Sequence, residues 1–226
     1  MISSNYSLVE GSLIQQLRFD TLSNNLANVN TNAFKQDIVS FDQNLSLNRS
    51  SIDLSSGPIV FTGNAFDVAL EGPGFFKIQT ASGIKYSRDG AFSLNRDGML
   101  VNRNGDKVLG KNGPITLTGN NIVIGSDGQI TEDGNPGDKI FVADIKDSKL
   151  LKKEGMNYYV YDGEAKNITS AEKVSIKQSY IEKSNVNVTE EMIRMVETLR
   201  TFESIQKALQ NTDETTGKMV NDSELL

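Results

Sequence analysis

Apolar side chains near the C-terminus recur at alternating spacings of four and three residues. The positions are Val188, Met192, Met195, Leu199, Phe202 and Leu209, with the polar Gln206 at one further position of the same spacing. This is the spacing of the a/d seam of a coiled coil, and it predicts a long helix. A helix lying on the core of its own domain would also carry an apolar stripe. Because this stripe is narrow and runs over many turns, we expect it to face partner helices.

The start of this helix is marked by Asn187 and Glu190. Asn at the N-cap with Glu three residues later can satisfy two backbone donors that the first turn leaves open. Glu190 also precedes Arg194 by four residues, as Glu203 precedes Lys207. Such acid-to-base pairs stabilise the solvent-facing side of a helix.

A second helical pattern, with few charges, covers about residues 5–27. Its apolar positions are Val9, Leu13, Leu17, Leu22 and Leu26. Isolated helices are marginally stable in water, so the two terminal helices must pair with each other or with copies from neighbouring chains. We therefore predict an assembly interface made by Val9, Leu13, Leu17, Leu22, Leu26, Val188, Met192, Met195, Leu199, Phe202 and Leu209.

The middle of the chain has a different pattern. Residues 36–65 are rich in Ser and Asn and predict an extended connector. From Phe66 the apolar period changes to two, and pairs such as Asp89-Gly90 and Asp97-Gly98 recur as turn signals. This pattern predicts hairpins in a mainly antiparallel β domain. The expected strands are 75–80, 84–88, 92–95, 122–124, 139–145, 158–161 and 174–180.

The expected fold class is therefore α+β, with long terminal helices that form a coiled-coil layer on assembly. We divide the chain into an N-terminal helix and motif (1–35), the connector (36–65), the central β domain (66–180) and a C-terminal coiled-coil helix (181–226).

The composition argues against an enzyme. The 226 residues include no Cys, His or Trp, which removes thiol nucleophiles, Ser-His-Asp arrangements and nearly all zinc sites. The acidic turns at 127–128 and 132–134 lack the spacing of an EF-hand and are explained by ordinary turn chemistry. We expect no catalytic residue, no cofactor and no metal.

Charge limits the possible partners. The net charge of -6 and the pI near 4.8 argue against nucleic acid and anionic membranes, since both require basic patches. The chain has no apolar run of the length that spans a bilayer. Its N-terminus lacks the basic start and apolar core of a cleavable signal peptide, so we expect any export to use another route.

Segments in three regions of the chain resemble one protein family. Leu22-Ser23-Asn24-Asn25-Leu26-Ala27-Asn28-Val29-Asn30-Thr31-Asn32-Ala33-Phe34-Lys35 closely resembles the N-terminal signature of bacterial flagellar rod and hook proteins, with Ala33 in place of the usual Gly. Asp67 to Phe76, Tyr86 to Phe92 and Asp97 to Val101 resemble its β-domain motifs. Ser184-Asn185-Val186-Asn187-Val188-Thr189-Glu190-Glu191-Met192 and Arg200-Thr201-Phe202-Glu203 resemble its C-terminal motif. The residues that carry the signature are Asn24, Asn25, Leu26, Ala27, Asn28, Asn30, Phe34, Lys35, Ser184, Asn185, Val186 and Asn187.

The resemblance implies a structural subunit of the flagellar basal-body rod. Such a subunit is exported by the flagellar type III apparatus and polymerises helically in the periplasm, with copies of itself and neighbouring rod proteins as partners. Its terminal helices order on assembly into a tubular coiled-coil layer, and it has no small-molecule substrate. Residues 108–117 and 200–203 resemble the proximal-rod type more than the distal-rod type. The rival interpretation is a secreted β-domain carbohydrate-binding protein that its terminal helices dimerise.

Overall fold

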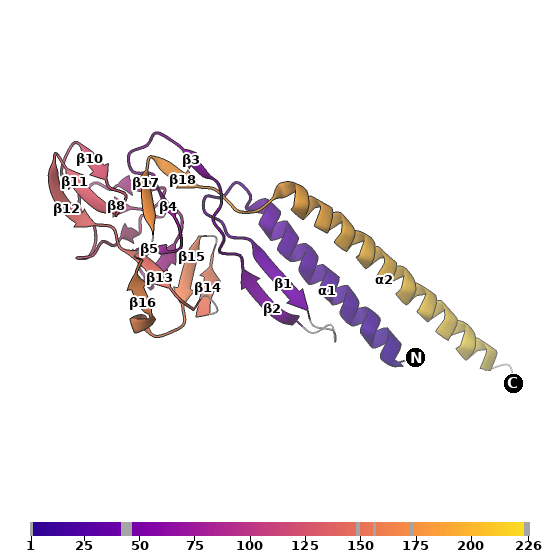
Figure 1. Ribbon diagram of the computed structural model, residues 1–226. Coiled ribbons are helices and arrows are strands. Elements are labelled where there is room, and N and C mark those ends of the chain that lie inside the picture. The colour runs from indigo at the N-terminus through magenta and orange to yellow at the C-terminus, as the bar shows by residue number, and fades with distance from the viewer. Residues whose placement is uncertain (1, 42–46, 148–149, 156, 172–173, 224–226) are drawn as a thin grey trace. The chain divides into compact units, whose positions relative to one another are not determined.

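The computed structural model describes residues 2–41, 47–147, 150–155, 157–171 and 174–223 (Figure 1). They form two compact units. The helical unit comprises Met1–Ala27, Gln36–Asp53 and Val186–Leu226, and the β unit comprises Asn28–Lys35 and Leu54–Asn185. Two terminal helices and mainly antiparallel sheets confirm the α+β class.

In the helical unit, α1 (Ile2–Ala27) and α2 (Val188–Ser223) lie side by side (Figure 1). Gln206 Nε2 of α2 donates a hydrogen bond to Ser12 Oγ of α1 at 3.1 Å. Neither helix, over the residues that the structure describes, has a stretch apolar and long enough to cross a membrane.

The same unit contains an antiparallel hairpin of β1 (Asp37–Phe41) and β2 (Leu47–Ile52). In its register Asp37 is opposite Ile52, and Ser40 is opposite Arg49. The range 36–65, for which we expected an extended connector, thus includes this hairpin and also β3 (Ile59–Phe61), which belongs to the β unit.

The predicted N-cap of α2 at Asn187 is confirmed. The side-chain oxygen of Asn187 accepts hydrogen bonds from the backbone N–H of Thr189 at 3.1 Å and of Glu190 at 3.4 Å. These are the donors that a helix leaves without intrahelical partners. The carboxylate of Glu190 binds Arg194, so the predicted i,i+4 pair also forms.

The β unit contains the remaining strands: β4 (Val68–Glu71), β5 (Phe75–Thr80), β6 (Gly83–Ser87), β7 (Ser93–Leu94), β8 (Leu100–Val101), β9 (Lys107–Val108), β10 (Ile122–Ile124), β11 (Gln129–Glu132), β12 (Asn135–Lys139), β13 (Val142–Ile145), β14 (Leu151–Glu154), β15 (Tyr158–Tyr161), β16 (Ile168–Ser170), β17 (Ser175–Gln178) and β18 (Tyr180–Glu182), with the short helix η2 (Ala165–Asn167). The main sheet has the order β14-β15-β6-β5-β9-β8-β7, and β13 joins both β5 and β16. Smaller sheets pair β10-β11-β12, β17-β4 and β18-β3.

One apolar core holds these sheets together. Phe76 and Ile78 of β5 are fully buried and belong to a cluster with Leu100 and Ile115. Phe76 packs edge-to-face on Phe92, with ring centroids 5.0 Å apart, in the geometry that aromatic pairs favour. The predicted strands 75–80, 122–124 and 158–161 are confirmed as β5, β10 and β15.

The prediction of one strand over 174–180 is wrong. Ser179 adopts a φ of 67° and separates β17 from β18. Its N–H donates to Asp67 O at 2.7 Å, while its carbonyl accepts from Thr62 N at 2.8 Å. This break transfers the chain from pairing with β4 to pairing with β3. The range 139–145 is likewise divided between β12 and β13.

The acidic turns follow turn chemistry, as predicted. Asp127 Oδ1 accepts from Gln129 N at 3.1 Å, as in an Asx turn. Glu132 Oε2 accepts from the backbone N–H groups of Thr118 at 2.8 Å and Gly119 at 2.9 Å. These carboxylates therefore fix neighbouring loops.

The turn after β6 requires glycine at position 90, because another backbone segment passes very close to it. A Cβ at Gly90 would lie 1.7 Å from the carbonyl oxygen of Val68. The carbonyl of Gly90 in turn accepts from Val68 N at 2.9 Å. Only glycine permits the backbones to approach this closely.

Candidate assembly surfaces

On α1 the predicted interface residues Val9, Leu13 and Leu17 are exposed, with 47%, 61% and 39% of their surface accessible. Tyr6 extends the same stripe, since positions 6, 9, 13 and 17 follow helical spacing. Ile14, by contrast, is buried. The helix therefore presents a continuous apolar stripe to solvent in the single chain.

The other helix also has an exposed apolar stripe. It is formed by Val188, Met192, Val196 and Leu199, which are between 39% and 53% exposed. Ile193 lies beside it and is 56% exposed. We call Val188, Met192, Val196 and Leu199 the α2 stripe, and Tyr6, Val9, Leu13 and Leu17 the α1 stripe. Large apolar side chains left open in a row indicate a surface that binds another protein.

The predicted seam does not lie on one side of α2. Val188, Met192 and Leu199 are exposed, whereas Met195, Phe202 and Leu209 are partly buried. A heptad seam drifts by about 20° per heptad on a straight helix, because 3.6 residues per turn do not divide seven. Along α2 the seam therefore changes from the exposed side to the side where Gln206 bonds α1. Leu22 and Leu26 of α1 are partly buried.

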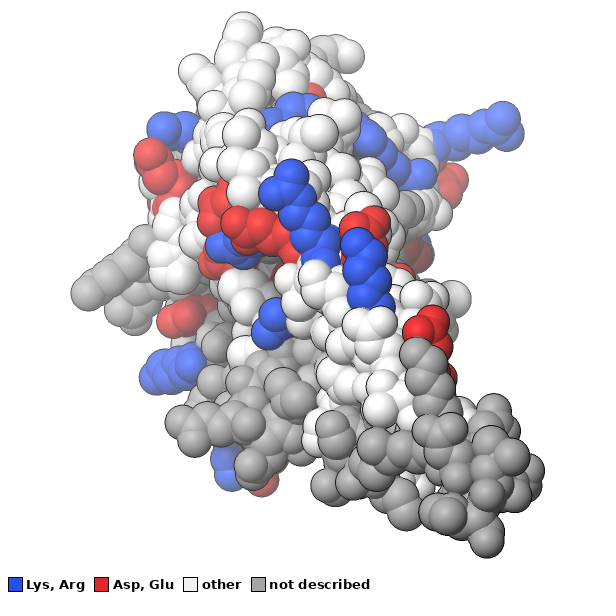
Figure 2. Space-filling model, turned by 90° about the vertical axis from the view of Figure 1, so that its right-hand side faces the viewer, with Lys and Arg blue, Asp and Glu red and all other residues white. Residues whose placement is uncertain are grey.

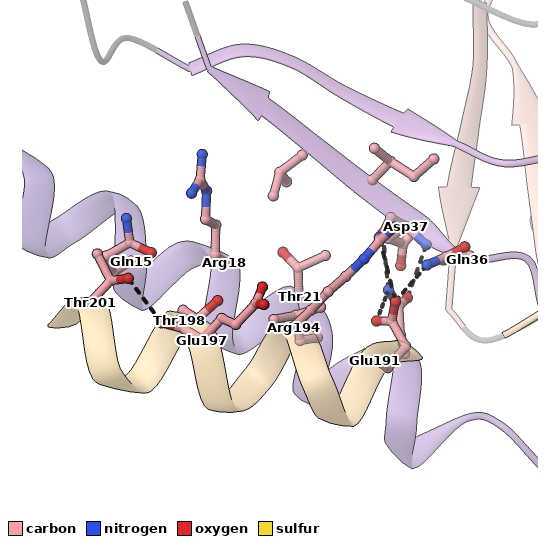
Figure 3. A pocket seen from close by; sticks show the side chains of 14 residues that line it. Gln15, Arg18, Thr21, Gln36, Asp37, Glu191, Arg194, Glu197, Thr198 and Thr201 are labelled. Atoms are coloured by element: carbon pink, nitrogen blue, oxygen red, sulfur yellow. Dashed lines mark hydrogen bonds and ion pairs between the residues drawn. The ribbon is translucent and has the colours of Figure 1, made fainter. Parts of the chain in front are cut away.

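A polar cavity of about 330 Å³ lies between α1, α2 and β1 in the helical unit (Figure 3). Glu191, 1% exposed, accepts from Gln36 Nε2 at 2.6 Å and from Asn25 Nδ2 at 3.0 Å. Asn25 also accepts from Asp37 N at 2.9 Å and donates to Asp37 O at 3.0 Å. The carboxamide thus pairs with β1 as a neighbouring strand would. Asn25 of the signature fixes the hairpin to the helices.

In the β unit, the signature residue Lys35 meets Glu182, whose side chain is completely buried. Glu182 Oε1 accepts from Lys35 Nζ at 2.6 Å and from Gly57 N at 2.8 Å, and Oε2 accepts from Arg88 Nε at 3.0 Å. Lys35 Nζ also donates to Ser55 O at 2.6 Å. A buried charge is tolerated only when it is paired and hydrogen-bonded, and this carboxylate has three donors.

Arg88 extends this buried network into the β-domain motifs. One of its terminal nitrogens donates to the carbonyls of Gly72 and Gly74, both at 2.8 Å. The other donates to Leu70 O at 3.4 Å. Two cations share one carboxylate, and backbone carbonyls stabilise the remaining positive charge. Segments that are far apart in the sequence therefore meet at Glu182.

The loop before Lys35 is also fixed. Phe34 is 1% exposed, and the ammonium of Lys153 lies 3.6 Å from the centroid of its ring. Ala33 has a φ of 53°, the left-handed conformation that suits the family's usual Gly, and its N–H donates to Glu182 O at 2.9 Å. Of the other signature residues, Asn28, Ser184 and Val186 are buried, Asn185 is partly buried, and Asn24, Ala27, Asn30 and Asn187 are exposed.

Sequence reasoning missed Glu182, Arg88 and Glu191 as central residues. An acid at the end of a strand or in the first turn of a helix ordinarily lies in water, and Glu191 also suits the dipole of a helix N-terminus. A signal was present, because Glu182 closely precedes the C-terminal motif and Arg88 lies inside a β-domain motif. Their pairing partners, however, could not be read from spacing.

On the face drawn in Figure 2, the described side chains of positive and negative charge are mixed. In Figure 2 blue and red side chains are interspersed, with uncharged surface between them. Long-range attraction of nucleic acid needs a basic patch, which this face does not offer.

Three family profiles match the chain in succession. Residues 6–35 match "Flagella basal body rod protein", residues 69–132 match "Flagellar hook protein FlgE/F/G D1 domain", and residues 177–222 match "Flagellar basal body rod FlgEFG protein C-terminal". The matches follow the order of the three resembling regions.

Individual proteins are similar over nearly their full length. The chain is 31% identical to the flagellar basal-body rod protein FlgG of Bacillus subtilis, covering 98% of this chain and 99% of that protein. It is 30% identical to FlgF of Caulobacter vibrioides, covering 86% and 87%. The flagellar hook-basal body complex protein FlhO of Bacillus subtilis is 28% identical over 98% of each chain.

Replacement of Glu182 by Gln should strongly destabilise the β unit. The substitution leaves two buried cations without a counter-charge, and breaking a buried ion pair in this way costs about 3 to 5 kcal/mol. We expect a large drop in the urea midpoint, followed by tyrosine fluorescence. Asp162→Asn is the matched control, since Asp162 pairs with Lys152 on the surface and both are well exposed. Equal midpoints for the two variants would show that the network adds no stability.

Proposed function

Because this chain belongs to the family of flagellar basal-body rod proteins, a family of structural subunits and not of enzymes, we propose that its two terminal helices carry the assembly of the rod. The observation that carries the proposal is the pair of exposed stripes. The chain pairs α1 with α2 through one side of each helix and leaves the α1 stripe and the α2 stripe open.

Burial of these stripes would supply the driving force. Each large apolar side chain transferred from water into an interface contributes roughly 1.5 to 3 kcal/mol. The four residues of the α2 stripe are about half exposed, so each has surface left to bury. The helix pair of one subunit thus contributes to a larger coiled-coil layer made with neighbouring subunits.

The two stripes differ, which favours an open assembly. One contains Tyr6 and Leu13, and the other contains Met192 and Val196. When the α1 stripe of one copy contacts the α2 stripe of the next without the reciprocal contact, the interface is heterologous, and it produces a helical filament when the rotation does not close a ring. A closed dimer needs a self-complementary patch instead. We therefore infer helical polymerisation with copies of this chain and with other rod proteins.

The chain is a component of the flagellar basal body, and we infer that it occupies the periplasmic part of the rod. Export through the flagellar type III apparatus follows from the same proposal. An exported chain must avoid premature polymerisation. Terminal helices that order only on assembly would provide this control, since isolated helices gain stability from packing.

We further propose the proximal rod, the FlgF-type position, with the distal FlgG-type position as the alternative. The support is the resemblance of residues 108–117 and 200–203 to the proximal type. Overall sequence identity does not distinguish the proximal from the distal position, because the FlgG and FlgF relatives are 31% and 30% identical to this chain.

Met192→Asp combined with Leu199→Asp should block assembly while the fold of the β unit is kept. Both side chains are exposed in the single chain, so the charges add no internal clash, but they would be buried unpaired in the interface. Filament growth is measured by sedimentation and electron microscopy. Folding of the β unit is measured by the NMR spectrum of its amide groups.

The control for this variant is Ser204→Asp with Thr215→Asp, which adds equal charge at exposed polar positions of α2. It should assemble like the unmodified chain. Normal growth of the Met192 and Leu199 variant would refute the role of the α2 stripe.

Amide hydrogen exchange should be fast in both helices of the monomer and slow after polymerisation. The helices bury only part of their surface in one chain, so local opening is easy until neighbours cover them. Exchange in β5 should be slow in both states, because its Phe76 and Ile78 lie in the core. Protected helices in a discrete, closed oligomer would instead support a dimerised β-domain protein.

Basal bodies from cells that lack this protein can test its position. If subunits are added at the outer end of the rod, loss of a proximal subunit should also remove the distal subunits. Mass spectrometry of the purified basal bodies should then find the FlgG-type protein missing. Its presence there would exclude the proximal assignment.

A further inference from the structure

The β unit contains a cavity of about 470 Å³ that assembly through the helices does not use. Its walls come from the loop after α1, the end of β6, the β8–β9 turn and the region where β15 begins. The lining is polar and rich in carboxamides: Asn30, Asn32, Asn102, Asn104 and Asn157. A concave site of this size with several convergent polar groups is the usual form of a small-molecule site.

Two of these carboxamides have one unused end. Asn32, 5% exposed, accepts from Lys183 Nζ at 3.1 Å, but its Nδ2 has no hydrogen-bond partner among the described residues. Asn157 donates through Nδ2 to Asp89 Oδ2 at 3.1 Å, and its Oδ1 has no partner there. Buried polar atoms without partners cost free energy and are rare in native proteins. One is a donor and the other an acceptor.

Neighbouring groups are held in fixed positions. The hydroxyl of Tyr158 donates to Asp106 and accepts from Asn102 Nδ2 at 2.5 Å and Asn104 Nδ2 at 3.0 Å. These hydrogen bonds orient this part of the lining before any ligand binds. Such preorganisation reduces the entropy that a ligand must lose on binding.

The carboxylate of Asp89 also lines the cavity. Burial raises the pKa of Asp89, and the N–H of Ala91 and the charge of Arg103 oppose that rise. Arg103 also lines the cavity and is exposed. The lining therefore offers donors, acceptors and one charge of each sign.

We propose that this cavity binds a saccharide. A sugar presents hydroxyl groups that donate and accept at once, which complements a lining of several carboxamides, each with a donor and an acceptor. Sequence-specific peptide binding instead needs apolar pockets for side chains, and the described lining has no Val, Leu, Ile, Met or Phe. The carboxamides, the carboxylate and the guanidinium suit a polyhydroxylated ligand.

The test is a titration of the full chain with chitotriose and with cellotriose, followed by saturation-transfer NMR and calorimetry. Saturation transfer to at least one trisaccharide, with saturable heat, is expected. Only chitotriose binding would assign an acetamido sugar, and cellotriose binding would assign recognition through hydroxyl groups. Absence of transfer to both at millimolar concentration would overturn the proposal.

Variants locate the binding. Asn157→Ala removes a lining carboxamide together with its bond to Asp89, and it should weaken binding about tenfold, the value of one hydrogen bond. Arg103→Ala changes an exposed lining residue, so it should weaken binding even if the first variant folds poorly. Asn120→Ala, an exposed loop position of the same unit outside the cavity, should bind normally. Equal affinity for all three variants would place any binding elsewhere and overturn the site.

The outcome is independent of rod assembly. The Met192→Asp and Leu199→Asp variant carries its changes in the helical unit and should bind the sugar like the unmodified chain. Failure of sugar binding with normal filament growth would refute this inference alone.

Discussion

The buried carboxylate of Glu182 is the interaction on which the β unit depends. It accepts hydrogen bonds from Lys35, Gly57 and Arg88, which come from three separate parts of the sequence. A charge removed from water must find its full set of partners inside the protein, so these segments are held in one arrangement. Besides forming these hydrogen bonds, the carboxylate links three segments of the chain. It requires that the loop after α1, the segment before β3 and the end of β6 all be in place together.

The helical unit follows a different physical rule. Its internal packing uses polar groups, such as Asn25, Gln36 and Glu191, where an autonomous domain would bury a large apolar core. Apolar side chains meanwhile remain on the outside, in the α1 stripe and the α2 stripe. Directional hydrogen bonds set the geometry of one subunit, and non-directional burial is left for contact with the next. This division suits a structural subunit that must stay single until it reaches its place.

The carboxamide-rich cavity gives the β unit a binding task that assembly does not require. Asn32 belongs to the loop of the signature, and its neighbour Lys35 serves the Glu182 network. One short segment thus serves both the internal stability of the unit and the wall of a binding site. The rival idea of carbohydrate binding had no candidate residues in the sequence, and the tertiary structure supplies them.

Much of the architecture was determined by the sequence alone. Helical periodicity and the cap at Asn187 defined α2, period-two alternation defined β5, β10 and β15, and the ordered motifs indicated the family. These signals are local, since each depends on residues within a few positions of one another. Tertiary structure decided the rest: the break at Ser179, the drift of the predicted seam to both sides of α2, the partners of Glu182 and the walls of the cavity. Those features arise where distant segments meet, and the free energy of burying a charge or an apolar side chain depends on neighbours that sequence spacing does not reveal.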